Sequence, residues 1–87
     1  MKLNEVRKLF DTENKRSADH GWEKITVISR DGKIVVRQKV SSRHSRLEME
    51  WLEWKAKSLG LTGTASLYDG QVGLYAQTWA EFEVSNA

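Results

Sequence analysis

Hydrophobic and polar residues change their spacing along the chain, and the central stretch has the clearest helical pattern. Four apolar residues recur at a spacing of three or four and form one stripe on a helix: Met49, Leu52, Ala56 and Leu59. Ser45 and Glu48 have the spacing of a capping box, and Gly60 stands where a left-handed residue would end a helix. The pattern predicts a helix over residues 43–59 whose apolar stripe packs on a sheet.

The same helix has a second apolar stripe, formed by Leu47, Trp51 and Trp54, on nearly the opposite side. A helix that covers one sheet needs only one stripe. The two tryptophans either cover the sheet edge or the other helix, or they are presented to a partner or a second subunit, since tryptophan is enriched in interface hot spots.

Residues 22–40 alternate between apolar and polar around Asp31-Gly32, which predicts an antiparallel hairpin with a two-residue turn. One face of this hairpin is apolar and should belong to the core: Ile25, Val27, Ile34, Val36 and Val40. The opposite face carries five cations: Lys24, Arg30, Lys33, Arg37 and Lys39. Such a face either protects a sheet edge from aggregation or is a footprint for phosphates or an acidic protein.

A second Asp-Gly pair, Asp69-Gly70, predicts a second hairpin in which Leu67 pairs with Val72 and Ala65 with Leu74. The expected core face consists of small and aliphatic residues: Ala65, Leu67, Val72, Leu74 and Ala76. Tyr68 and Tyr75 fall on the outer face, where they pack across strands, stack on a base or fill a pocket of a partner. Residues 79–84 alternate again and extend this sheet, with Ala80, Phe82 and Val84 opposite Trp79, Glu81 and Glu83.

Residues 2–14 fit a short amphipathic helix with Asn4 as its N-cap, and the polar residues that follow leave its end undefined. The resulting order is αββαββ. It predicts one small α+β domain over residues 1–87, with a four-stranded antiparallel sheet built from two Asp-Gly hairpins and two helices on one face.

Composition narrows the classes of function. The chain has no cysteine and no proline, so disulfides and thiolate metal sites are excluded. Its net charge of +2 is too small to indicate nucleic acid by itself. No apolar run is long enough for a membrane span and no signal peptide is visible, so we expect a cytoplasmic protein without membrane partners, encoded by a host or by a phage or plasmid.

No catalytic or metal-binding motif stands out. His20 and His44 are the two histidines available as a general base, and no nucleophile accompanies either in a recognised pattern. Two histidines so far apart match no metal-ligand spacing, and Gly-rich phosphate motifs are absent. The expectation is a protein that is not an enzyme and needs no cofactor or metal.

Binding is the remaining class. The sequence favours a small regulatory protein, an inhibitor or adaptor of the kind that mobile elements direct against host defence, docking on an acidic protein or nucleoprotein surface. The alternative is a nucleic-acid-binding module that uses a basic, tyrosine-bearing sheet face. In either case the expected contact residues lie on the sheet and the central helix: Lys24, Arg30, Lys33, Arg37, Lys39, Trp51, Trp54, Tyr68 and Tyr75.

Overall fold

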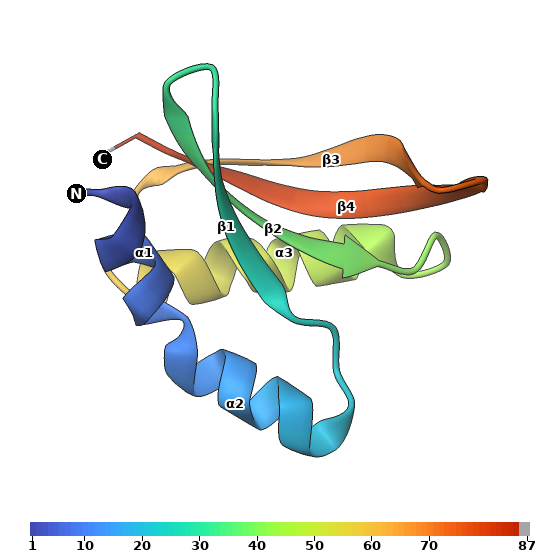
Figure 1. Cartoon of the computed structure of the whole chain (residues 1–87), viewed down its shortest axis with the longest axis horizontal. Helices are drawn as coiled ribbons and strands as arrows, with labels where there is room; N and C mark the ends of the chain where they lie inside the picture. The colour runs from blue at the N-terminus through green and yellow to red at the C-terminus, as the bar shows by residue number, and fades with distance from the viewer. Residues whose placement is uncertain (86–87) are drawn as a thin grey trace.

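The computed structural model describes residues 1–85 and has an α+β fold, as the sequence predicts (Figure 1). The elements in chain order are α1 (Leu3–Leu9), α2 (Asp11–His20), β1 (Ile25–Arg30), β2 (Lys33–Val40), α3 (Ser45–Ser58), β3 (Gly63–Val72) and β4 (Tyr75–Val84). The four strands form one antiparallel sheet in the order β1-β2-β4-β3. β4, the last strand along the chain, therefore lies inside the sheet between β2 and β3, and β1 and β3 are the two edge strands.

The first hairpin has the predicted register. Arg30 pairs with Lys33 across the turn, and Val27 pairs with Val36 further along. The turn residues Asp31 and Gly32 have φ values of 54° and 76°. Two consecutive left-handed residues are the geometry of a type I′ turn, whose twist matches that of the flanking strands. All five apolar residues predicted for its core face are buried.

The predicted second hairpin is wrong in its turn and register. The turn lies at Gly73-Leu74, and Val72 pairs with Tyr75 across it. Asp69-Gly70 lies inside β3, where Gly70 pairs with Gln77. Four of the residues expected in the core are exposed instead: Leu67, Val72, Leu74 and Ala76. Ala65 is partly buried and packs against the core.

Apolar burial explains why the later turn prevails over the Asp-Gly signal. With the turn at Gly73-Leu74, all ten residues of β3 pair with β4, and Ala80, Phe82 and Val84 of β4 enter the core. A turn at Asp69-Gly70 would leave Phe82, a large and fully buried side chain, outside the hairpin. Burying such a side chain stabilises the fold by about 1.5–3 kcal/mol, which exceeds the preference of a local turn.

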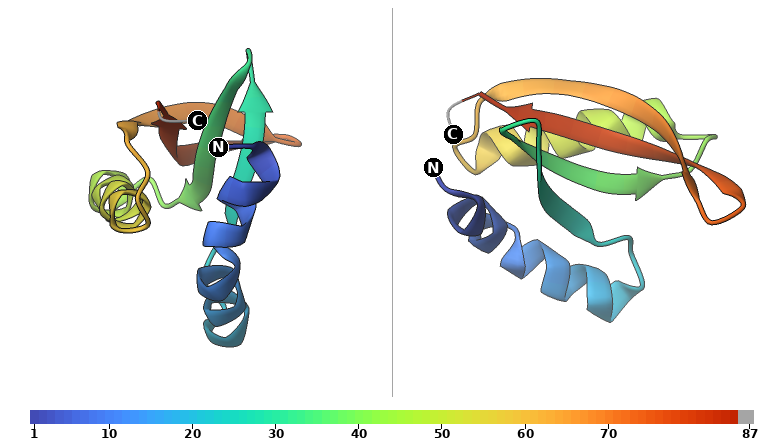
Figure 2. Two further views of the ribbon diagram at one scale, coloured as in Figure 1. Left: turned by 90° about the vertical axis from the view of Figure 1, so that its left-hand side faces the viewer. Right: turned by 45° about the horizontal axis from the view of Figure 1, so that its top comes forward.

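The N-terminal helical region consists of two helices that meet at Phe10. Asn4 lies within α1 and does not cap it; the N-cap position is Lys2 and has no side-chain cap bond. Residues 11–20, whose polar sequence gave no clear end, form α2, which ends at Gly21 with φ 70°. Helix α2 has no apolar stripe and points away from the sheet (Figure 2).

Helix α3 ends as the sequence predicts but begins differently. The backbone N–H of Gly60 donates to Lys57 O and that of Leu61 to Ala56 O, and Gly60 has φ 90°. This is a Schellman motif. The predicted capping box is wrong: the N-cap is His44, without a side-chain cap bond, and the Glu48 carboxylate accepts a hydrogen bond from the backbone N–H of Ser41.

One hydrophobic core lies between the inner face of the sheet and the helices. Helix α1 contributes Val6 and Phe10, and α3 contributes Leu52 and Ala56 from its predicted stripe. Met49 and Leu59 of that stripe are partly buried and pack against this core. The position of α3 under β3 and β4, and of α1 under β1, fixes which side chains remain on the surface (Figure 2).

Candidate binding surfaces

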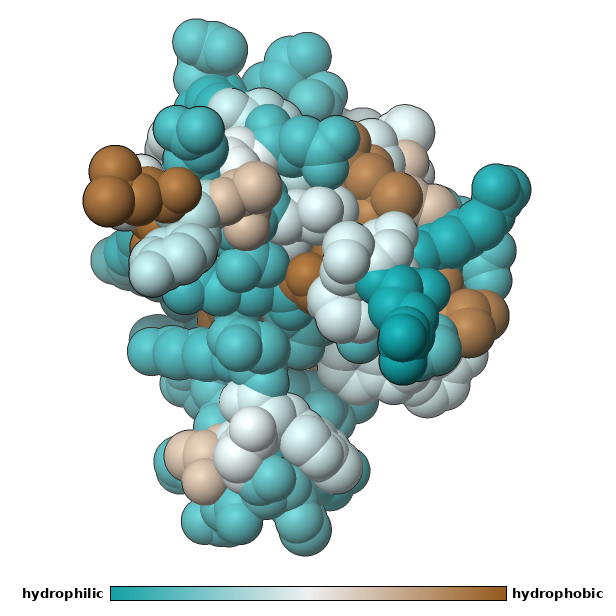
Figure 3. All heavy atoms as spheres, turned by 90° about the vertical axis from the view of Figure 1, so that its right-hand side faces the viewer, coloured by the Kyte–Doolittle hydropathy of each residue, from teal (hydrophilic) through white to brown (hydrophobic). Residues whose placement is uncertain are grey.

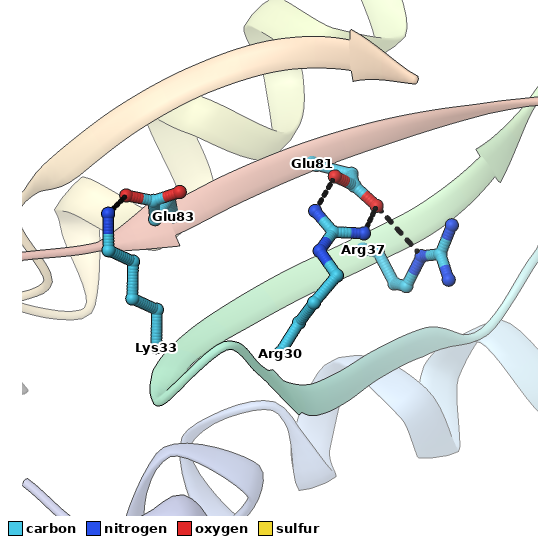
Figure 4. Close-up of polar contacts among 5 residues, drawn as sticks. All are labelled: Arg30, Lys33, Arg37, Glu81 and Glu83. Atoms are coloured by element: carbon cyan, nitrogen blue, oxygen red, sulfur yellow. Dashed lines mark hydrogen bonds and ion pairs between the residues drawn. The ribbon is translucent and has the colours of Figure 1, made fainter. Parts of the chain in front are cut away.

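The outer face of the sheet carries acids as well as the predicted cations, because β4 lies next to β2. Glu81 of β4 pairs with Arg37 of β2 in the ladder, and its carboxylate accepts two hydrogen bonds from Arg30, at 3.1 and 2.5 Å (Figure 4). This hydrogen-bonded carboxylate raises the pKa of the Arg30 guanidinium. Glu83, one pleat further along, forms an exposed ion pair with Lys33 at 3.1 Å.

Glu81 is the anchor of this arrangement. The residue is only 4% exposed, although its side chain lies on the outer face of the sheet. Arg37 Nε lies 3.2 Å from the same carboxylate, an ion-pair contact without hydrogen-bond geometry. A buried carboxylate between two guanidinium groups is held by charge-assisted contacts, and these fix the two arginines to the sheet.

Aromatic rings complete the cluster. The Arg37 guanidinium lies 3.9 Å from the ring centroid of Trp79, and the Lys39 ammonium lies 5.5 Å from the same ring. Arg30 and Arg37 both lie over the ring of Tyr68, at 5.3 and 5.5 Å. These are cation–π distances. Three of the predicted contact residues, Arg30, Arg37 and Tyr68, are thus brought together, but they contact one another and Glu81.

The remaining predicted sheet residues have different surroundings. Lys24 is exposed just before β1, and neither Lys24 nor Lys39 has an ion-pair partner among residues 1–85. Tyr75 is highly exposed at the tip of the second hairpin, beyond Thr78, where the pairing of β4 with β2 ends. The tyrosines therefore do not form one stacking platform. Seen from the side of this hairpin tip, apolar side chains form separate patches among hydrophilic ones (Figure 3).

The second stripe of α3 is on the surface. Trp54 is 62% exposed and Trp51 is 40% exposed, and Leu47 beside them is exposed as well. Tryptophan is highly buried on average in folded proteins, so two exposed tryptophans one turn apart are unusual. Trp51 faces the space between α3 and α2.

A groove of about 360 Å³ lies in that space. Its lining comes from α2, the segment before β1, the end of β2, and α3: Ser17, Trp22, Glu23, Gln38, Lys39, Glu48 and Trp51. Trp22 is 58% exposed, and its ring stacks on that of His20 with centroids 4.7 Å apart. The groove is therefore open to solvent and has two indole rings in its walls.

Two polar contacts hold α2 in place beside the groove. Lys55 of α3 lies 2.7 Å from the carboxylate of Glu13 on α2, and both side chains are largely buried. The side-chain amide of Asn14 forms two hydrogen bonds with the backbone of Ile25. The shape of the groove depends on these contacts, because α2 has no apolar face that packs on the sheet.

Several residues of these surfaces were not among the predicted contacts, and the most important of them are Trp22, Trp79 and Glu81. The alternation of residues 79–84 places Trp79 and Glu81 on the outer face, and the structure confirms this alternation. Their contact with the cations of β2 depends on the strand order, which neither hairpin defines alone. Trp22 lines the groove because α2 and α3 approach each other, a long-range arrangement without a local sequence signal.

The search for metal sites, for membrane-spanning helices and for similar proteins does not point to a function. Among the described residues, no group of three or more His, Cys, Asp or Glu side chains is arranged to hold a metal ion. Within the same part of the chain, no helix is long and apolar enough to cross a membrane. No family model, no curated protein and no solved structure matches the chain.

Proposed function

We propose that this chain is a non-catalytic binding protein, an inhibitor or adaptor, that docks on another protein through the α2–α3 side. The observation that carries the proposal is that Trp22 and Trp51 both line the groove and are exposed, and that a third exposed tryptophan, Trp54, follows Trp51 by one turn of α3. Indole rings bury a large area with little loss of side-chain entropy, and tryptophan dominates interface hot spots. Water-exposed rings around an open groove are suited to that use.

The groove supplies the anchor position. Its volume of about 360 Å³ is at the lower end of the range for small-molecule sites, and it is open rather than enclosed. That size suits one or two side chains of a partner that insert between Trp22 and Trp51. Trp54 and Leu47 extend the apolar contact along α3.

The groove itself has two carboxylates in its lining, Glu23 and Glu48, so the attraction for an acidic partner surface would come from Lys39 and the neighbouring Lys24. Lys39 lines the groove and has no acid partner in the described part of the chain, and Lys24 is exposed nearby in sequence to Trp22. Charges of this kind steer association more than they raise affinity. The other cations contribute less, because Glu81 and Glu83 already neutralise Arg30, Lys33 and Arg37 in part.

Nucleic-acid binding by the sheet face is the weaker alternative. Stacking of successive bases needs several open rings together, but Arg30 and Arg37 lie over the ring of Tyr68, and the exposed Tyr75 lies apart from it at the hairpin tip. Phosphate binding needs free cations, and two carboxylates share this face with them.

A pull-down from lysate with the immobilised chain, with and without nuclease, tests the proposal. We expect a protein partner that is retained after nuclease treatment and lost with the double variant Trp51→Ala/Trp54→Ala. Leu74→Ala is the matched control, because Leu74 is a highly exposed apolar residue on the hairpin tip. Loss of all captured material after nuclease treatment would instead support nucleic acid, and equal capture by both variants would exclude the tryptophan surface.

A further inference from the structure

The two edge strands of the sheet differ in whether side chains of the N-terminal helices form hydrogen bonds with their backbone. At the β1 edge, the Asn14 side-chain amide donates to Ile25 O at 2.9 Å and accepts from Ile25 N at 2.8 Å. Arg7 Nε donates to Val27 O at 3.2 Å. These side chains form the hydrogen bonds that a neighbouring strand would form, so most of the outward backbone groups of β1 are not available to pair with another chain.

At the β3 edge the backbone groups remain open. Val72 and Tyr75 flank a two-residue turn and form a hydrogen-bonded pair, so alternate residues of β3 bond to β4. The intervening residues direct their N–H and C=O groups outward: Gly63, Ala65, Leu67, Asp69 and Gln71. The same rule for the first hairpin directs Ile25 and Val27 outward, which is where Asn14 and Arg7 bind. No hydrogen bond from residues 1–85 reaches the five outward backbone positions of β3.

The composition of β3 does not discourage pairing. Edge strands are commonly protected by lysine, proline, a bulge or short length. β3 has ten residues, contains no lysine, arginine, glutamate or proline, and has Asp69 as its one charged residue. Leu67, at the middle of the outward set, is exposed.

We infer that β3 pairs with β3 of a second copy of this chain, antiparallel about a two-fold axis at Leu67. Leu67 then faces Leu67 of the second copy, and Ala65 faces Asp69. All five outward positions are used, and no like charges stand opposite each other. The two sheets join into one antiparallel sheet of eight strands.

The occupant is a second copy because of the asymmetry of the two edges. A head-to-tail array would require β3 of one copy to bind β1 of the next, and Asn14 and Arg7 already occupy that edge. Pairing of like edges is isologous and closes at two copies. The outer edges of the dimer are then both β1 edges, so growth stops. This inference is independent of the proposed function, since the groove lies beside β2 and α2.

Sedimentation equilibrium of the full chain over a range of concentrations tests the inference. We expect a monomer–dimer equilibrium with a Kd below about 1 mM and no larger species. Leu67→Lys places two cations face to face across the axis and should weaken the dimer at least about tenfold. Ser29→Lys is the matched control: it adds the same charge at an exposed, outward position of the occupied β1 edge and should leave the Kd unchanged.

Amide hydrogen exchange gives a readout that needs no variant. At concentrations that favour the dimer, the amides of Ala65, Leu67, Asp69 and Gln71 should gain protection relative to the dilute protein. The amides of Ser66 and Tyr68, which bond to β4, should be protected at both concentrations. A protein that stays monomeric near 1 mM, a dimer that Leu67→Lys leaves intact, or open-ended assembly would each overturn the inference.

Discussion

Lys55 of α3 lies 2.7 Å from Glu13 of α2, and the two side chains are only 19% and 10% exposed. This ion pair links a helix of the core to a helix that has no apolar face. Lys55→Met would leave the Glu13 carboxylate buried beside Arg16, which is 3.8 Å away and more exposed. We expect the free energy of unfolding to fall by about 1–3 kcal/mol.

Hydrogen exchange and denaturant unfolding measure this prediction. The amides of α2 should lose protection before those of α3. Lys57→Met is the control, because Lys57 forms an exposed pair with Glu53 at 3.7 Å and should contribute less than about 0.5 kcal/mol. Equal effects of the two variants would mean that the buried pair does not hold α2.

Glu81 should contribute far more to stability than Glu83, although both lie on β4 and form ion pairs with cations of the first hairpin. Glu81→Ala leaves Arg37, with a largely buried side chain, without its counter-ion and should cost about 2–4 kcal/mol. Glu83→Ala removes an ion pair in which both side chains are half exposed and should cost less than about 1 kcal/mol. Urea unfolding of the two variants measures both losses of stability. Equal losses would mean that burial of the Glu81 carboxylate does not add to its contribution.

Gly63 is required where β3 begins, for a steric reason. A Cβ atom at this position would stand 1.9 Å from the backbone oxygen of Glu83. Backbone cannot move aside as a flexible side chain can, so Gly63→Ala should destabilise the fold by about 3 kcal/mol or more. Ser66→Ala, at an exposed position of the same strand, should stay within about 0.5 kcal/mol of the parent. A Gly63→Ala variant as stable as the parent would mean that the strand can shift.

Leu52 and Leu47 belong to different stripes of α3 and should differ in how much they contribute to the free energy of unfolding. Leu52 is fully buried, so Leu52→Ala should cost about 2–5 kcal/mol. Leu47 is exposed, and Leu47→Ala should change stability by less than about 0.5 kcal/mol. Thermal unfolding of both variants measures the difference, and a small effect at Leu52 would contradict the observed packing of α3.

Replacing both histidines tests the absence of histidine-based catalysis. His20 stacks on Trp22 and His44 precedes α3, so they belong to different parts of the fold. The double variant His20→Gln/His44→Gln removes one ring stacked on Trp22 and should lower partner binding and any biological effect by no more than about tenfold. A loss of about 10²-fold or more in a folded variant is typical of removing a general base and would contradict a pure binding role.

Local signals in the sequence were sufficient for the first hairpin and for the end of α3. Asp31-Gly32 defines both the turn and the register, and Gly60 defines the Schellman motif, because both depend on the backbone freedom of one or two residues. The second Asp-Gly pair misleads because Gly70 is tolerated inside a strand. The ring of Tyr68 lies beside it, 2.9 Å from where a Cβ atom would stand.

The candidate surfaces were only partly accessible to sequence reasoning. The pattern identifies a second stripe with Trp51 and Trp54 but leaves open whether it packs on the sheet edge or the other helix or is presented to a partner. Both side chains are exposed in the structure. It also identifies the cations of the first hairpin. It does not reveal that Glu81 lies among them, because that contact requires β4 to lie between β2 and β3. The groove with Trp22 likewise depends on the position of α2, which polar long-range contacts define.

The central position of β4 has a consequence for the order in which the molecule folds. Each hairpin can form from neighbouring residues, but the ladder between β2 and β4 joins segments separated by the whole of α3 and β3. Closing that loop costs chain entropy before its contacts are gained, and such non-local pairing slows folding. Docking of the two preformed hairpins, with α3 closing beneath them, is therefore the expected rate-limiting step, and substitutions in the β2–β4 ladder should slow refolding more than substitutions in either turn.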